Sequence, residues 1–155
     1  MTVLNGRTLR AWAEQFSVVE NLSRVDENCI QLALDRDFAV VAPPAGTSVR
    51  YEGELDESWI TRWTLDDDED LLLEPGKPVL ACTAERVQMP PGYVGFVQTK
   101  GSLARHFVIA HCADGQVDSG YVGKITLELC NLGRYPVRLR GGDFVALLFI
   151  HRLSE

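Results

Sequence analysis

Short apolar runs separated by Gly and Pro turns fill most of this chain and limit the folds that it can adopt. Turns are indicated at residues 43–46, 74–77 and 89–93, and the apolar runs beside them have the length of β-strands. Short strands at regular spacing favour an all-β sandwich or barrel. We expect one domain over residues 1–155, because this length is typical of a single folding unit.

Several of the runs predict individual strands. Residues 29–41 alternate in polarity and carry β-branched and aromatic side chains, so they indicate one strand. Residues 71–87 contain two apolar runs around a Gly turn, which is the pattern of a β-hairpin. Further strands are expected at residues 94–99 and 144–153.

The N-terminal segment has a different period. A helix is expected over residues 2–16, with Thr2 or Asn5 as its N-cap, because its apolar side chains recur at roughly helical spacing: Leu4, Leu9, Trp12 and Phe16. The apolar stripe of this helix is expected to dock on the body of the fold.

Residues 98–105 have the composition of an anion-binding corner. Two cationic side chains, Lys100 and Arg105, flank Gly101 and Ser102. Glycine lets a ligand come close to the backbone, and successive backbone N–H groups can form a concavity that binds anions. The planar guanidinium of arginine matches phosphate oxygens. This segment therefore indicates a site for a phosphate-bearing ligand.

The strand expected at residues 124–130 carries a carboxylate on its polar face. Successive side chains of a strand point to opposite sides, so one face is apolar and belongs to the core: Ile125, Leu127 and Leu129. Thr126 and Glu128 share the other face, and Asp118 lies across a Gly-rich turn. Together with the cationic corner, these residues suggest a pocket for a small phosphorylated molecule.

Charge and composition exclude several partners. The net charge of −7 argues against binding to a nucleic-acid polymer, which needs a basic face. No apolar run is long enough to span a bilayer, and the N-terminus lacks the pattern of a signal peptide, so we expect a cytoplasmic protein without membrane contact. The cysteines are widely spaced and form no CxxC pair, so a structural zinc site is not expected: Cys29, Cys82, Cys112 and Cys130.

The order of these motifs resembles the dCTP deaminase branch of the dUTPase-like superfamily. The resemblance rests on Lys-Gly-Ser-Leu-Ala-Arg at 100–105, on His111, on Val-Asp-Ser-Gly-Tyr at 117–121, and on the runs 123–131 and 139–148. It implies a dUTPase-like (β-clip) distorted barrel or jelly roll with a short N-terminal helix. It also implies a homotrimer whose sites lie between subunits, with residues 100–105 of one subunit facing Asp118 and Glu128 of its neighbour.

The resemblance further implies an activity, the deamination of dCTP to dUTP and ammonia, with Glu128 as the catalytic acid/base. The zinc-deaminase signature is absent, so chemistry at the ring would proceed without zinc, and Mg²⁺ would arrive on the triphosphate. By the same resemblance, cationic and hydroxyl groups would hold the triphosphate, Asp118 would meet the sugar 3′-hydroxyl, and the strand would border the pyrimidine. The substrate-binding residues would be Lys100, Gly101, Ser102, Arg105, Asp118, Thr126 and Leu127.

Three departures from the family pattern keep other functions open. By the same resemblance, Gly101 stands where a serine helps to position the reactive water, and Asp114 adds a carboxylate near the ring; we also expect the family's C-terminal tail to be absent after Glu155. One alternative is a dUTP pyrophosphatase or a bifunctional enzyme, in which Asp118 guides the attacking water. The other alternative is a nucleotide-binding homologue with weakened catalysis.

Overall fold

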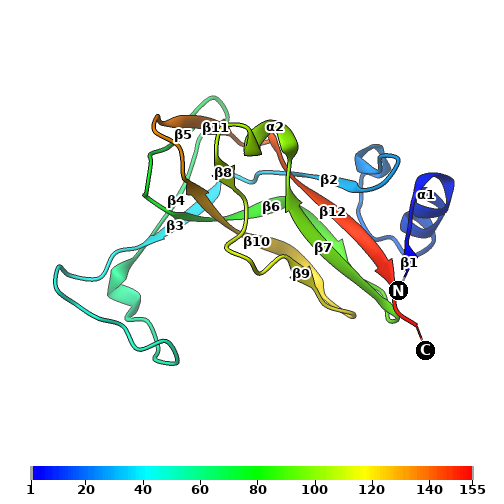
Figure 1. Cartoon of the computed structure of the whole chain (residues 1–155), viewed down its shortest axis with the longest axis horizontal. Coiled ribbons are helices and arrows are strands. Elements are labelled where there is room, and N and C mark those ends of the chain that lie inside the picture. Colours follow the sequence, from blue (N-terminus) through cyan, green and yellow to red (C-terminus); the bar gives the residue numbers. More distant parts are fainter. Residues whose placement is uncertain (1, 155) are drawn as a thin grey trace.

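Two five-stranded sheets and one two-stranded sheet make up most of the part of the chain that the computed structural model describes, residues 2–154 (Figure 1). The strands are β1 (Thr2–Val3), β2 (Ile30–Ala33), β3 (Asp37–Val41), β4 (Ile60–Thr64), β5 (Asp70–Leu73), β6 (Val79–Gln88), β7 (Tyr93–Thr99), β8 (Val108–Ile109), β9 (Gln116–Val117), β10 (Val122–Asn131), β11 (Val137–Arg140) and β12 (Phe144–Arg152). The helices are α1 (Gly6–Gln15) and α2 (Gly101–Ala104), with 3₁₀ turns η1 (Leu22–Arg24) and η2 (Glu57–Trp59).

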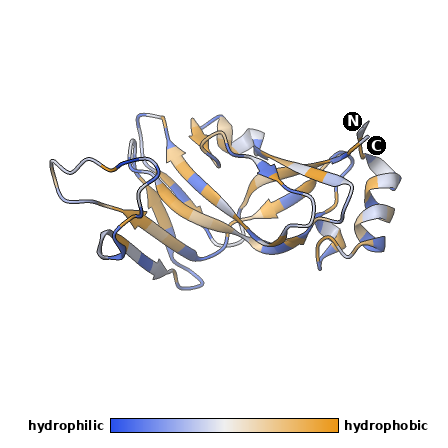
Figure 2. Ribbon diagram, turned by 90° about the horizontal axis from the view of Figure 1, so that it is seen from below, coloured by the Kyte–Doolittle hydropathy of each residue, from blue (hydrophilic) through white to orange (hydrophobic). Residues whose placement is uncertain are grey.

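The sheets are largely antiparallel, and each draws on distant parts of the chain. The first has the order β1-β12-β7-β9, with β2 also paired to β12; the second has the order β4-β3-β6-β10-β8; the third pairs β11 with β5. Hydrophobic residues line the strands (Figure 2). Full burial of a leucine or isoleucine contributes about 1.5–3 kcal/mol, and several such side chains have no exposed surface: Ile30, Leu32, Leu127, Leu129, Leu148 and Ile150. The all-β prediction is confirmed.

The hairpin predicted for residues 71–87 is wrong. β5 pairs with β11, whereas β6 pairs with β10 and β3. The turn between β5 and β6 is held instead by β10, because the N–H of Gly76 donates to the carbonyl of Asn131 at 3.0 Å. The two apolar runs therefore find their partners elsewhere in the chain.

The single strand predicted for residues 29–41 is two strands in different sheets. β2 pairs with β12, and β3 pairs with β4 and β6. The chain passes from one sheet to the other between β2 and β3. There the N–H of Leu34 donates to the backbone carbonyl of Asp143, and the N–H of Asp35 donates to the backbone carbonyl of Cys82, both at 2.9 Å. One continuous alternation of polarity in the sequence therefore spans two strands that belong to different sheets.

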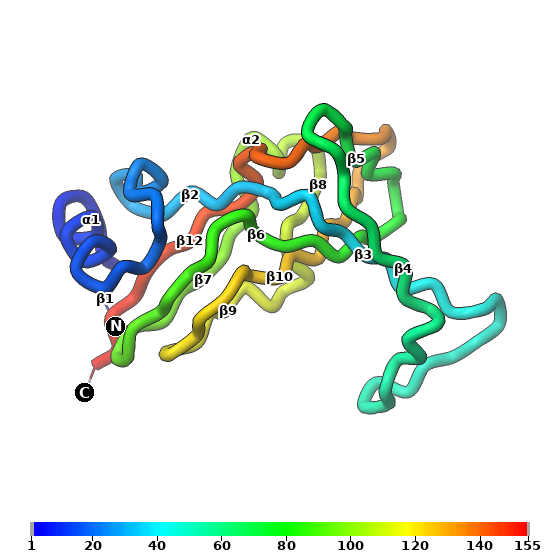
Figure 3. The backbone as a smooth tube through the Cα atoms, turned by 180° about the vertical axis from the view of Figure 1, so that it is seen from behind, coloured from blue at the N-terminus to red at the C-terminus, as the bar shows by residue number. Residues whose placement is uncertain are grey.

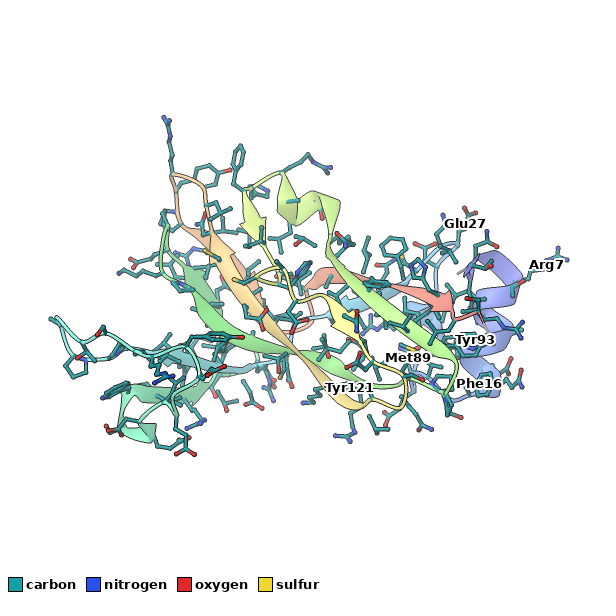
Figure 4. The ribbon with its side chains drawn as sticks, turned by 60° about the horizontal axis from the view of Figure 1, so that its bottom comes forward. Arg7, Phe16, Glu27, Met89, Tyr93 and Tyr121 are labelled. Carbon is teal, nitrogen blue, oxygen red and sulfur yellow. The ribbon has the colours of Figure 1, made fainter. Side chains whose placement is uncertain are left out.

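The N-terminal helix exists but begins later than predicted. Thr2 and Val3 pair with β12, and Asn5 occupies the N-cap position of α1 without a side-chain hydrogen bond. The helix docks as expected, through an aromatic cluster in which the Trp12 and Tyr93 ring centroids are 4.9 Å apart. Phe16 lies 5.9 Å from the same tyrosine ring, and the two are labelled side by side in Figure 4. No helix within residues 2–154 has both the length and the apolar composition needed to cross a bilayer.

A long excursion between β3 and β4, residues 42–59, extends away from the sheets (Figures 1 and 3). Its ends are held together, because Val41 pairs with Ile60 and the N–H of Ala42 donates to the carbonyl of Trp59 at 2.9 Å. Tyr51 is 97% exposed. We call this excursion the arm.

A buried threonine organises the middle of β10. Three residues of β6, 83–85, lie opposite Ile125 where the register between the two strands shifts. The Thr83 hydroxyl accepts a hydrogen bond from the N–H of Ile125 at 2.9 Å and donates to the carbonyl of Glu85 at 2.8 Å. Thr83 has no exposed surface. The hydroxyl thereby replaces missing ladder bonds just before Thr126 and Glu128.

Candidate active site

The two faces of β10 are as the sequence predicts. Leu127 and Leu129 have no exposed surface and Ile125 is 8% exposed, whereas Thr126 is exposed and Glu128 is half-buried. Because the side chain of Leu127 lies in the core, it has only its backbone to offer a ligand.

Glu128 receives a hydrogen bond from a turn beside β10. The N–H of Cys112 donates to Glu128 Oε2 at 3.2 Å, and no other protein group within residues 2–154 bonds this carboxylate. One N–H donor leaves the remaining lone pairs of the carboxylate available. A half-buried carboxylate with spare acceptor capacity can act as a proton carrier.

The turn that carries Cys112 is fixed by close packing. Ala113 adopts a left-handed conformation with φ of 69°. The N–H of Val97 donates to the carbonyl of Gly115 at 2.6 Å, and a Cβ added at Gly115 would lie 2.6 Å from the carbonyl oxygen of Val97. Glycine is therefore required at this approach to β7. Asp114 is exposed on the same turn, two residues from the N–H that bonds Glu128.

The cationic corner is built on α2. The N–H of Lys100 donates to the carbonyl of Val145 at 2.9 Å, and the buried side chain of Leu103 anchors the helix. Lys100 Nζ lies 5.0 Å from the centroid of the Phe144 ring. Within the described residues, neither Lys100 nor the exposed Arg105 forms an ion pair. Both positive charges are therefore free to meet an anion.

Asp118 lies on the turn after β9. Its Oδ1 accepts a hydrogen bond from Gln116 Nε2 at 2.7 Å, and the side chain is exposed. The next residue anchors the turn, because the Ser119 hydroxyl accepts from the N–H of Gly92 at 3.1 Å.

The predicted site residues fall into separate groups within one chain. Thr126 and Glu128 share a face of β10, and the residues of 100–105 lie together on and around α2. No hydrogen bond, ion pair or pocket of the part that the structure describes joins 100–105 to Asp118 or Glu128. The four best-defined pockets of residues 2–154 do not bring the cations and the acids together.

A polar network ties the start of β10 to the junction of β2 and β3. Lys124 forms an ion pair with Asp35, and Cys82 Sγ lies 3.5 Å from Asp35 Oδ2. Burial, with the nearby Asp35 carboxylate, raises the pKa of Cys82 to about 11. Burial alone would raise the pKa of Asp35, but the bonds from Lys124, from the N–H of Arg36 and from Cys82 together lower it.

The structure also shows which features the sequence did not indicate. The Cys112 N–H beside Glu128 is a backbone group, so no side-chain pattern could have marked it. In the sequence, Thr83 has the pattern of an ordinary strand residue, and nothing there indicates its two buried hydrogen bonds. Within residues 2–154, no three His, Cys, Asp or Glu side chains are grouped so as to hold a metal ion.

The arrangement of the sheets defines a fold that is shared with a solved deaminase. The solved structure of 2′-deoxycytidine 5′-triphosphate deaminase from Agrobacterium tumefaciens matches 98% of this chain with a TM-score of 0.73 and 18% identity. This chain covers 48% of that chain.

Comparison of sequences narrows the class to a family. A family model described as dCTP deaminase-like matches residues 3–153, and the chain belongs to this family. A dCTP deaminase of Halorubrum lacusprofundi is 42% identical over 92% of this chain and 73% of its own length. A "dCTP deaminase, dUMP-forming" of Methanopyrus kandleri is 32% identical over 100% of this chain and 84% of its own length. The resemblance read from the motifs is confirmed.

Proposed function

We propose that this chain deaminates dCTP to dUTP and ammonia, with Glu128 as the acid/base. The observation that carries the proposal is the half-buried Glu128 carboxylate, which has one backbone donor and free acceptor capacity on the polar face of β10. In the proposed step, Glu128 takes a proton from water as the oxygen attacks C4 of the ring, and it delivers that proton to N3. Glu128 then takes the proton of the new C4 hydroxyl and gives it to the amino group, so that the C–N bond breaks, ammonia leaves, the C4 carbonyl of uracil forms and the carboxylate is regenerated.

The complete site is proposed to form between subunits of a homotrimer. Lys100, Ser102 and Arg105 of one subunit would hold the triphosphate. This role is supported by the absence of any ion pair to the lysine or the arginine within residues 2–154. The neighbour would supply Glu128 and Asp118, which share no pocket with that corner in one chain. Gly101 would allow the backbone to approach a phosphate, and Thr126 and Leu127 would present backbone groups to the pyrimidine.

Magnesium is proposed to enter with the substrate. Mg²⁺ usually binds substrate phosphates and keeps several waters rather than using a dedicated protein cage. It would neutralise part of the triphosphate charge, while the residues around α2 position the phosphate oxygens.

A second product is a specific alternative. The relative from Methanopyrus kandleri, which matches all of this chain, is named as dUMP-forming. Asp118 is an exposed carboxylate whose Gln116 contact leaves one oxygen free, so it could orient a water for attack on the α-phosphorus. The products then would be dUMP, pyrophosphate and ammonia.

Product analysis separates these functions. The protein is incubated with dCTP and Mg²⁺, and ammonia, pyrophosphate, dUTP and dUMP are followed. Ammonia with dUTP supports the deaminase, and ammonia with pyrophosphate and dUMP supports the bifunctional enzyme. If neither product forms while dCTP still raises the melting temperature, the chain is a nucleotide-binding homologue with weakened catalysis.

Glu128→Gln tests the assigned role. It should lower ammonia release by at least ~100-fold, since it removes the proton carrier but keeps the shape. Glu52→Gln, in the arm, is the matched control and should leave the rate unchanged. Unaltered ammonia release by Glu128→Gln would show that the assignment is wrong.

A further inference from the structure

A pocket beside the cationic corner contains more hydrogen-bond donors than the sequence motifs indicate. It has a volume of about 840 Å³ and is lined by residues from α2, β11 and the start of β12. Four of its side chains can donate hydrogen bonds: Ser102, His106, Tyr135 and Arg138. Much of the remaining wall is apolar, including Leu103 and Phe144. Ser102 connects this pocket to the corner proposed to hold the triphosphate.

The imidazole of His106 is oriented by Tyr135. His106 Nδ1 lies 3.1 Å from the tyrosine hydroxyl oxygen, and the two rings meet edge to face with centroids 6.2 Å apart. When the hydroxyl donates to Nδ1, the neutral imidazole carries its hydrogen on Nε2, which becomes a donor for a ligand. No carboxylate of the described chain forms an ion pair with His106.

The balance of charge around the pocket is positive. Arg138 Nη1 is 3.8 Å from Asp70 Oδ2, but Asp70 is engaged more closely by Arg140, whose Nε donates to Oδ1 at 2.7 Å. Lys100 Nζ adds a second positive charge over Phe144, a ring of the pocket wall. One carboxylate, Asp143, also lines the pocket, and its Oδ2 accepts from the N–H of Arg140 at 2.8 Å. Two cations therefore outweigh one engaged carboxylate, and the Ser102 hydroxyl and the His106 imidazole add neutral donors.

We propose that this pocket binds the polyphosphate of the nucleotide, with His106 and Arg138 acting as phosphate-binding residues beside Lys100 and Ser102, and with Tyr135 orienting His106. The identity of the ligand rests on the proposed function. The binding chemistry rests on the pocket itself, because charged donors to phosphate oxygens form the stronger hydrogen bonds. These residues hold the end of the substrate remote from the ring, so they bind the substrate without touching the reacting atoms.

The test uses inorganic tripolyphosphate and deoxycytidine as separate probes, measured by calorimetry on the full chain. Arg138→Ala should weaken tripolyphosphate binding about tenfold, and His106→Ala about threefold to fivefold, as expected for one charged and one neutral hydrogen bond. Arg134→Ala is the matched control, since Arg134 is exposed and does not line this pocket; it should change binding less than twofold. Deoxycytidine binding should stay the same in all variants, and equal melting temperatures show that they are folded.

The outcomes show separately whether the pocket binds polyphosphate and whether the proposed deamination occurs. If dCTP is deaminated, Arg138→Ala should raise KM with kcat unchanged, because it removes binding that is equal in the ground and transition states. If no ammonia forms but Arg138→Ala still weakens tripolyphosphate binding, the function fails and the pocket stands. If wild type does not bind tripolyphosphate, or if Arg138→Ala and His106→Ala bind it within twofold of wild type, the pocket is refuted whatever the activity.

Discussion

Replacing Thr83 by valine is expected to destabilise the fold by about 2–6 kcal/mol. The two side chains have nearly the same shape, so the change removes only the hydroxyl. The N–H of Ile125 loses its acceptor at 2.9 Å and the carbonyl of Glu85 loses its donor at 2.8 Å, both beside a fully buried residue. A buried polar group left unsatisfied costs about 1–3 kcal/mol, and two such groups give the expected sum. This is a large part of a typical total stability of about 5–15 kcal/mol.

The measurement is urea unfolding at one fixed protein concentration, because any self-association would couple stability to concentration. Thr83→Ser keeps the hydroxyl and should cost only about 1 kcal/mol for the lost methyl group. Thr61→Val, on the exposed side of β4, is the matched control and should stay within about 0.5 kcal/mol of wild type. If Thr83→Val and Thr83→Ser are equally stable, the hydroxyl does not replace the ladder bonds and the reasoning is refuted.

Two further substitutions and one labelling experiment test the site and its surroundings. Gly101→Ser restores the serine expected from the family; an added Cβ meets no atom closer than 3.9 Å, so stability should be unchanged and ammonia release should rise about tenfold. Asp35→Asn should reduce the loss of unfolding free energy that urea titrations measure below about pH 4. Burial alone would raise the folded pKa of Asp35, but the bond from Lys124 contributes most to lowering it. The stability that the Asp35 carboxylate contributes is therefore present above its unfolded pKa and is lost as the pH falls through the folded pKa. Peptide mapping after brief iodoacetamide treatment at pH 8 should find Cys112 alkylated first, because it is the exposed cysteine. Of the two partly exposed cysteines, Cys82 should react last, because its pKa is raised to about 11. Earlier alkylation of Cys82 would contradict this order.

The sequence predicts best what depends on neighbouring residues. The buried and exposed faces around Thr126 and Glu128 follow from a two-residue period, which any paired strand must obey. α1 begins later than its apolar spacing predicts, because Thr2 and Val3 are held by pairing with β12, at the opposite end of the chain. The local spacing of apolar residues does not indicate a pairing partner so far away in the sequence.

Partner choice also explains the errors in the sheets. Leu71 and Leu73 have the composition of a hairpin strand, but they pair with β11, more than sixty residues away. The same limit applies to the site. Glu128 can be proposed as a site residue from its own motif, whereas His106 and Tyr135 are 29 residues apart and meet only in the folded chain.

The arm has a consequence for how this chain can be engineered. It leaves and re-enters the second sheet at one place, where Val41 pairs with Ile60 and the Ala42 N–H bonds the carbonyl of Trp59. Exposed segments whose bases are already joined accept new chain ends well. A circular permutant opened near Tyr51 should therefore keep every strand pairing of both large sheets, and the same position offers a graft point for a fluorescent reporter.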